Sequence, residues 1–169
     1  MPGSPTEEGG PALVAVPTSD YLWFVDLALA QMTAIVEDLG DELVNRRPPF
    51  RDTNSAYVIL THCLGVMEYW GGATVAERPI QRDRAAEFTA SGDVAALLRR
   101  TEQARRRLQE DLVGLDTAAP PVNVRPDPDD PVPYTERKGA VLLHLLEELF
   151  QHCGQMELTR DALVADRRR

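Results

Sequence analysis

The stretch VLLHLLEELFQHCGQMELTRD, residues 141–161, predicts a long helix with two polar residues on its buried face. At 3.6 residues per turn, apolar side chains fall in one stripe, made by Val141, Leu145, Leu149, Met156 and Leu163. Glu148 and His152 fall in the middle of this stripe. The face that should pack into the core therefore carries a carboxylate and an imidazole.

Glu148 and His152 have the spacing of two ligands for one metal ion. Residues four apart on a helix project to the same side, about 6 Å from each other, which lets both side chains reach one ion. The chain has three histidines, and besides His144 and His152 only His62 remains, in a second apolar helical run. His62 is thus a candidate third ligand, and the alternative is a hydrogen-bonded core histidine. One carboxylate and two neutral imidazoles leave a divalent ion with positive charge and an open position, as in catalytic zinc sites.

Composition limits the class of protein and its partners. At 169 residues and 43% hydrophobic, the chain is long enough for one domain with its own core. Its net charge of -9 argues against nucleic acid and anionic membranes as partners. The first thirty residues lack the features of a signal peptide, so we expect a cytoplasmic protein. Residues 1–17 are rich in proline and glycine and predict a disordered tail, followed by a single domain at 18–166.

Two apolar patterns in the first half of the chain predict two long helices. In residues 19–45, apolar side chains recur at spacings of three and four, and Pro48 and Pro49 end the helix. Residues 55–76 are apolar on nearly all sides, which indicates a helix buried on two sides and an internal His62. Three residues offer N-caps for this second helix, namely Asp52, Thr53 and Asn54.

The second half of the chain predicts two more helices with long connections. Residues 77–90 have no clear period and indicate a crossover segment. A third helix is expected over 93–115 with Ser91 as its cap. The Pro-rich stretch 116–134 predicts an extended surface connection, and Thr135 would cap the fourth helix. This order of elements predicts an all-α fold, a four-helix bundle with a long crossover connection.

Three motifs resemble the DinB-like superfamily, especially its actinobacterial branch. They are HCLGVMEYW at 62–70, RDRAAEF at 82–88 and LLHLLEELFQHCGQMELTRD at 142–161. Many members of that superfamily place a three-histidine metal site on the second and fourth helices. Here Glu148 stands at the first position of the fourth helix, and the related mycothiol-dependent maleylpyruvate isomerases use a His, Glu, His set with the same spacing. The resemblance therefore implies His62, Glu148 and His152 as metal ligands.

The same resemblance implies a metal-dependent transferase or isomerase. Members use a low-molecular-weight thiol, mycothiol or bacillithiol, and the metal-bound thiolate would attack a small electrophile. Zinc is the expected ion, although nickel, manganese and iron also fit these ligands. No second acid or base stands out in the sequence, which leaves a non-catalytic alternative, a metal-binding protein of the stress response or a binder of small molecules.

Five further residues are candidates for orienting a ligand or lining a substrate pocket: Tyr69, Trp70, His144, Gln155 and Arg160. Gln155 falls about 20° from Glu148 around the helix and would otherwise be solvated. His144 lies about 80° from His152, which favours a place in the cavity wall over ligation. The alternative for Tyr69 and Trp70 is packing in the hydrophobic core, and the alternative for Arg160 is a surface ion pair.

A second apolar stripe on the last helix predicts a homodimer. It is made by Leu143, Leu146, Phe150 and Val164, about 180° from the first stripe. One helix cannot turn both faces to the same four-helix core, and the Pro-rich segment offers little apolar area to cover the second face. A second copy of the stripe is self-complementary about a two-fold axis, so we expect packing through Leu146 and Phe150.

Overall fold

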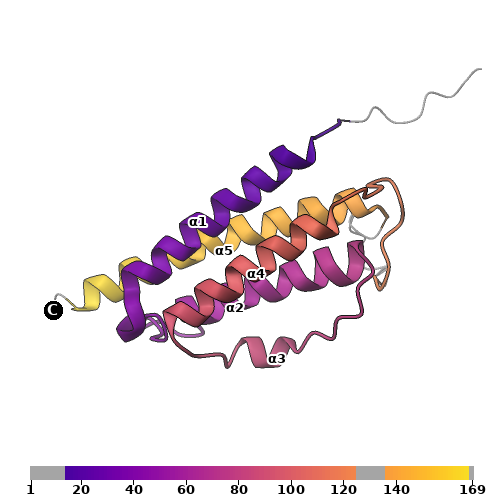
Figure 1. Cartoon of the computed structure of the whole chain (residues 1–169). Coiled ribbons are helices and arrows are strands. Elements are labelled where there is room, and N and C mark those ends of the chain that lie inside the picture. Colours follow the sequence, from indigo (N-terminus) through magenta and orange to yellow (C-terminus); the bar gives the residue numbers. More distant parts are fainter. Residues whose placement is uncertain (1–13, 125–135, 168–169) are drawn as a thin grey trace, which may run out of the picture.

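The computed structural model describes residues 14–124 and 136–167. Its elements, in chain order, are α1 (Thr18–Leu43), α2 (Ala56–Val66), the π-helix η1 (Met67–Val75), α3 (Arg84–Glu87), α4 (Val94–Asp111) and α5 (Lys138–Arg167). Figure 1 shows four long rods side by side, because η1 continues α2, and the short α3 lies outside them. The predicted all-α bundle is confirmed. None of the helices in the described part is long and apolar enough to cross a membrane.

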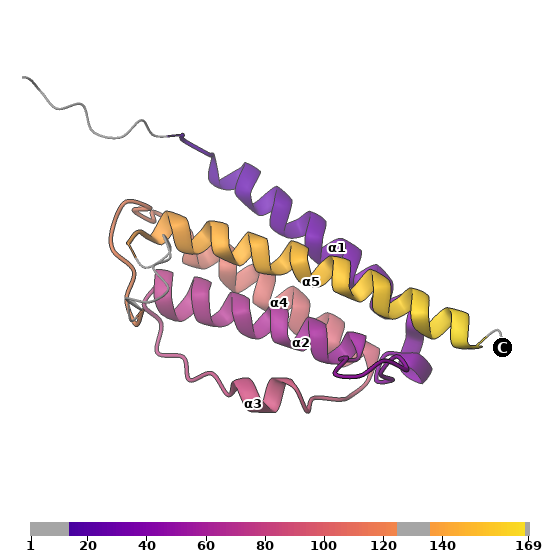
Figure 2. The same ribbon diagram turned by 180° about the vertical axis from the view of Figure 1, so that it is seen from behind.

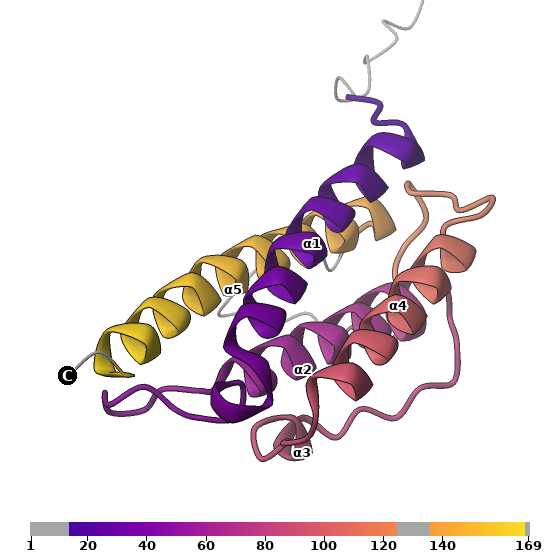
Figure 3. The ribbon, with the colours of Figure 1, turned by 60° about the vertical axis from the view of Figure 1, so that its left-hand side comes forward.

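The four rods do not alternate simply in direction. In Figures 1 and 2, α2 and α4 run the same way, while α1 and α5 run the opposite way. This order arises because the connection that contains α3 carries the chain back along the length of the bundle before α4 begins. Figure 3 shows α5 next to α1, and α5 also packs against α2 and η1, whereas α4 packs against α1, α2 and η1. The predicted crossover therefore sets the topology.

The helix caps differ from those predicted. Ser55 caps α2, because its hydroxyl accepts a hydrogen bond from the Val58 N–H at 3.3 Å. Asp93 caps α4 through the Ala96 N–H at 2.7 Å. An N-cap side chain reaches only the backbone N–H groups two or three residues ahead of it. Residues farther from the start of the helix therefore cannot be its N-cap. The predicted caps Asp52, Thr53, Asn54 and Ser91 were therefore wrong, while Thr135 lies outside the described residues.

The core contains the stripe that the sequence predicted. Its five apolar residues on α5 are all buried, at 2% exposure or less: Val141, Leu145, Leu149, Met156 and Leu163. Residues 58–67 of α2 and η1 are buried on every side, and His62 is internal as predicted. Cys63 and Cys153 are free thiols in this core. On the outer stripe of α5, Leu143 is 65% exposed and Phe150 38% exposed.

The change from α2 to η1 alters the register of the side chains beside the predicted site. A π-helix has a wider turn than an α-helix, and such stretches occur frequently at functional sites. The helix predicted for 55–76 therefore exists, but beyond Met67 its side chains leave the 3.6-residue period. A Cβ atom added at Gly71 would lie 2.7 Å from Cδ1 of Leu108, so this wide turn packs closely on α4.

Candidate metal centre

The structure brings together the three residues that the sequence predicted as ligands. His62 projects from α2, and Glu148 and His152 project from α5. One ligand atom from each side chain lies within 4.8 Å of the other two. Oε2 of Glu148 is 3.4 Å from Nε2 of His152 and 3.8 Å from Nε2 of His62. Two helices far apart in the sequence thus present one carboxylate and two imidazoles to a common point.

The spacing of these atoms fits a shared ion. Ligands about 2.1 Å from a tetrahedral zinc ion lie about 3.4 Å from each other. The observed 3.4 and 3.8 Å are close to this separation and are long for direct hydrogen bonds. The His62 side chain is 7% exposed, and those of Glu148 and His152 are 23% and 21% exposed. The centre is therefore open on the side of α5 and closed on the side of α2.

The other ring nitrogen of His62 is hydrogen-bonded to a carboxylate. Nδ1 of His62 lies 2.8 Å from Oε2 of Glu87, the last residue of α3. Since a carboxylate accepts hydrogen bonds, Nδ1 carries the proton, and in the neutral ring Nε2 keeps a free lone pair facing Glu148. Arg82 donates to the same carboxylate through Nε, at 2.7 Å, and Nη2, at 2.9 Å. A metal-ligating histidine typically has this kind of partner.

His152 has a matching arrangement on the opposite side of the site. Its Nδ1 donates to Oε1 of Gln155 at 2.8 Å, so Nε2 of the neutral ring also faces Glu148 with a free lone pair. The two imidazole rings meet edge to face with centroids 4.9 Å apart. Both histidines therefore present the nitrogen that a metal ion requires, and each is held in place by a residue outside the three.

The charges of the site are coupled. The imidazole of His152, and then that of His62, hold the pKa of Glu148 well below its usual range, although burial opposes this. In turn, Glu148 raises the pKa of His152, again against the effect of burial. Burial alone would raise the pKa of Glu87, but its hydrogen bonds with Arg82 and His62 outweigh it, and the pKa is lowered. Both carboxylates are thus ionised at neutral pH. Arg82 offsets the charge of Glu87, whereas the charge of Glu148 faces the two Nε2 atoms and can attract a cation.

A model of the mycothiol-S-transferase family matches residues 22–165. The chain belongs to this family. The match runs from the second turn of α1 to the last turn of α5 and includes all three predicted ligands. Neither the curated proteins nor the solved structures contain a match to the chain. Membership of the mycothiol-S-transferase family indicates mycothiol-dependent transferase activity and supports the suspected DinB-like relationship.

Aromatic side chains and a third histidine border the centre in this mycothiol-S-transferase family member. Nε2 of His144 lies 3.8 Å from Oε1 of Glu148, the oxygen that does not face the other two histidines. The His144 ring packs edge to face against Trp70, which packs in the same way against Tyr69. His144, Glu147 and Glu148 form a second group close enough to hold an ion, but this group uses the same Glu148 carboxylate.

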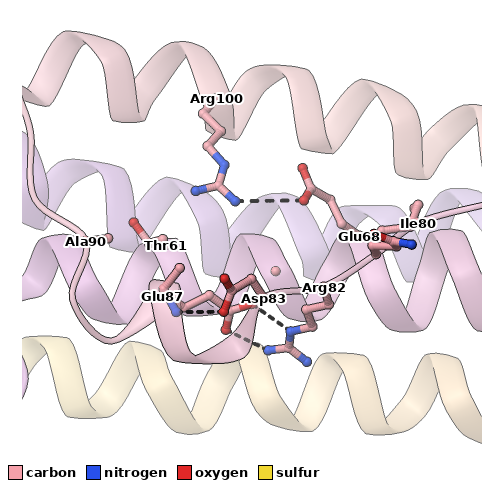
Figure 4. A pocket seen from close by; sticks show the side chains of 11 residues that line it. Thr61, Glu68, Ile80, Arg82, Asp83, Glu87, Ala90 and Arg100 are labelled. Carbon is pink, nitrogen blue, oxygen red and sulfur yellow. Dashed lines mark hydrogen bonds and ion pairs between the residues drawn. The ribbon is translucent and has the colours of Figure 1, made fainter.

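A polar pocket of about 280 Å³ lies on the far side of Glu87 (Figure 4). Arg100 of α4 and Glu68 of η1 extend into it and lie 3.8 Å apart. Arg82 and Glu87 form the wall that the pocket shares with the metal centre. Thr61 also lines the pocket, and its hydroxyl is buried and has no hydrogen-bond partner among the described residues. The pocket thus gives the Glu87 carboxylate free space on the side away from His62.

The residues around the three ligands were predicted only in part. Gln155 and His144 lie beside the centre. The guanidinium carbon of Arg82 lies over the Tyr69 ring, 5.8 Å from the ring centroid. Arg160 is instead bonded to Asp161 at the surface, two helical turns beyond His152. Glu87 and Arg82 were missed as site residues. Both lie in RDRAAEF, a motif that stood out in the sequence but lacks any helical period.

Proposed function

We propose that the chain is a metal-dependent mycothiol S-transferase whose ion is held by His62, Glu148 and His152. The observation that carries the proposal is the convergence of two Nε2 atoms and one carboxylate oxygen, with each Nδ1 bonded elsewhere, in a chain of this family. A divalent ion held there would supply Lewis acidity that favours the ionised form of a thiol at neutral pH. We further propose zinc as the ion, because mixed nitrogen and oxygen donors suit it.

The roles of the chain's own residues follow from charge and exposure. Glu148 contributes one negative charge, so a divalent ion bound there keeps a net positive charge with which to attract a thiolate. Glu87 and Gln155 hold the two imidazoles in the tautomer that binds metal. The partly exposed Glu148 and His152 leave the α5 side open to a thiol, and the rings of Trp70 and His144 border this side.

The proposed reaction is transfer of the mycothiol sulfur to a small electrophile. The thiol proton passes to water, and the sulfur then forms a bond with the electrophilic carbon. The bond from that carbon to its leaving group breaks in the same step, and the leaving group departs with the electron pair. Family membership favours mycothiol over bacillithiol and favours an enzyme over a non-catalytic binding protein.

Metal analysis followed by thiol assays tests the proposal. Protein purified without chelator should contain about one divalent ion per chain and should consume mycothiol in the presence of small alkylating electrophiles. Bacillithiol and cysteine at equal concentration serve as comparison thiols. Activity should disappear with a strong chelator and return when zinc is added. Full activity in the chelator would contradict the proposal, as would equal rates with mycothiol and cysteine.

A further inference from the structure

Glu87 is an unusual residue because a short helix in a surface connection buries its carboxylate. The residue is only 6% exposed, although the other three residues of α3 are exposed. Its two oxygens are fully engaged, Oε2 with His62 and Oε1 with Arg82. A buried carboxylate needs such partners, because desolvation of an unpaired charge is costly. The connection before α4 therefore reaches into the bundle at one point, directly behind a predicted metal ligand.

The surface of α2 is shaped to receive this carboxylate. Gly65 lies three residues after His62, one turn along the same helix. A Cβ atom at Gly65 would overlap Oε1 of Glu87 and would lie 2.7 Å from its Cδ. No side chain, not even a methyl group, fits at this position while Glu87 holds His62. By contrast, a Cβ atom at Gly154 on α5 would have no neighbour within 4 Å.

We propose that Glu87 is a positioning residue of the metal centre, acting through His62, and that Gly65 provides the space for its carboxylate. Arg82 holds the same carboxylate in place, since the adjoining pocket would otherwise let it turn away from His62. The crossover segment thus completes the centre without supplying a ligand. This inference rests on the proposed metal-dependent function, but one of its tests needs neither metal nor activity.

The physical effect is selection of one imidazole tautomer. Free neutral imidazole side chains in water favour the proton on Nε2, the nitrogen that His62 must offer to a metal. The Glu87 carboxylate stabilises the proton on Nδ1 instead and leaves Nε2 unprotonated. It also fixes the plane of the ring. Partners of this type typically contribute 10–100-fold to metal affinity, and we expect an effect of about that size here.

The first experiment measures metal affinity by competition with a chelating dye. Glu87→Ala should lower zinc affinity about 10–100-fold, and Glu87→Gln should lower it less, because its amide oxygen still accepts from Nδ1. Glu68→Gln, which neutralises another carboxylate of the same pocket, is the control and should leave the affinity unchanged. Equal affinity of Glu87→Ala and the unaltered chain would overturn the proposal.

A second experiment tests Gly65 with a double-mutant cycle. Gly65→Ala should lower zinc affinity about as much as Glu87→Ala, whereas Gly154→Ala should not change it. In the Glu87→Ala background the overlap is gone, so adding Gly65→Ala should have no further effect on affinity. The double variant lacks the overlap, because Glu87→Ala removes the atoms that a Cβ at Gly65 would meet, so it serves as the comparison if Gly65→Ala alone is unstable. Additive losses would show that Gly65 does not act through Glu87.

The third readout is the tautomer of His62 in the metal-free protein. The chain has three histidines, so their ring nitrogen signals are few enough to assign by NMR. We expect the Nδ1–H form in the unaltered chain and a shift toward the Nε2–H form in Glu87→Ala. An unchanged tautomer would overturn the inference. If the protein binds no metal but this shift occurs, the proposed function fails while the positioning role of Glu87 stands.

Discussion

Replacing Glu148 by glutamine removes one charge from the predicted centre and nearly preserves its shape. Oε2 of Glu148 lies 3.4 Å from Nε2 of His152. Two unit charges at that distance interact by about 1 kcal/mol in water and about 5 kcal/mol at an effective dielectric constant of 20. The side chain is 23% exposed, so the value should lie between these limits, and a divalent ion doubles it. We therefore expect Glu148→Gln to weaken zinc binding by at least about 2 kcal/mol, or about 30-fold.

The assay is competition with a chelating dye at pH 7.5, with Glu147→Gln as the matched control. Glu147 is the next residue on α5, carries the same charge and has a side chain that is 62% exposed. Its replacement should leave zinc affinity within a factor of about two. The same Glu148→Gln variant should also lower the pKa of His152 in the metal-free protein, because Glu148 is the main cause of its elevation. Equal zinc affinities of the two variants would show that the Glu148 carboxylate does not bind the ion.

Three other predictions concern pH, association and the core. In chelator, protonated His152 stabilises the fold fully below its unfolded pKa of about 6.5, and ionised Glu148 does so fully above its unfolded pKa of about 4.3. Thermal melts should therefore show the greatest stabilisation by this pair between these two pH values. The stabilisation should be lost as pH rises through the raised pKa of His152. With zinc, which competes with protons, stability should instead rise with pH over this range. Phe150→Glu should convert a dimer into a monomer in sedimentation without changing metal content, and a monomeric unaltered chain would refute the dimer. In denaturant titrations, Leu149→Ala should lower the free energy of unfolding by about 2–5 kcal/mol. Leu158→Ala, at a 74% exposed position, should lower it by less than about 0.5 kcal/mol. Equal decreases in the two variants would contradict the assigned core.

The bundle and the convergence of its polar residues follow from periodicity. The α5 stripe shows which face is buried, and the two polar residues within it therefore had to be internal or functional. The same reasoning located His62 on the buried α2. Because only three histidines exist, few combinations were possible. A regular helix fixes where a side chain points, and this is why Glu148 and His152 could be paired from their spacing alone.

The contacts made by the crossover could not be derived in this way. Glu87 lies in a helix of four residues, too short to show a period, and its path over α2 depends on long-range contacts. Gly65 was a signal, since a glycine within a buried apolar helix usually marks a close approach, but its partner cannot be read from spacing. The π-helix η1 was not predicted either; it packs against α4 and α5, and such long-range contacts leave no period in the sequence.

Anomalous X-ray diffraction at the zinc edge, from crystals of protein purified with zinc, would locate the ion relative to the three proposed ligands. We expect one peak per chain, within about 2.0–2.2 Å of Nε2 of His62, Oε2 of Glu148 and Nε2 of His152. Crystals of His62→Ala should lack this peak. A peak instead between His144 and Glu147, or no peak within reach of His62, would show that these three residues do not form the metal site.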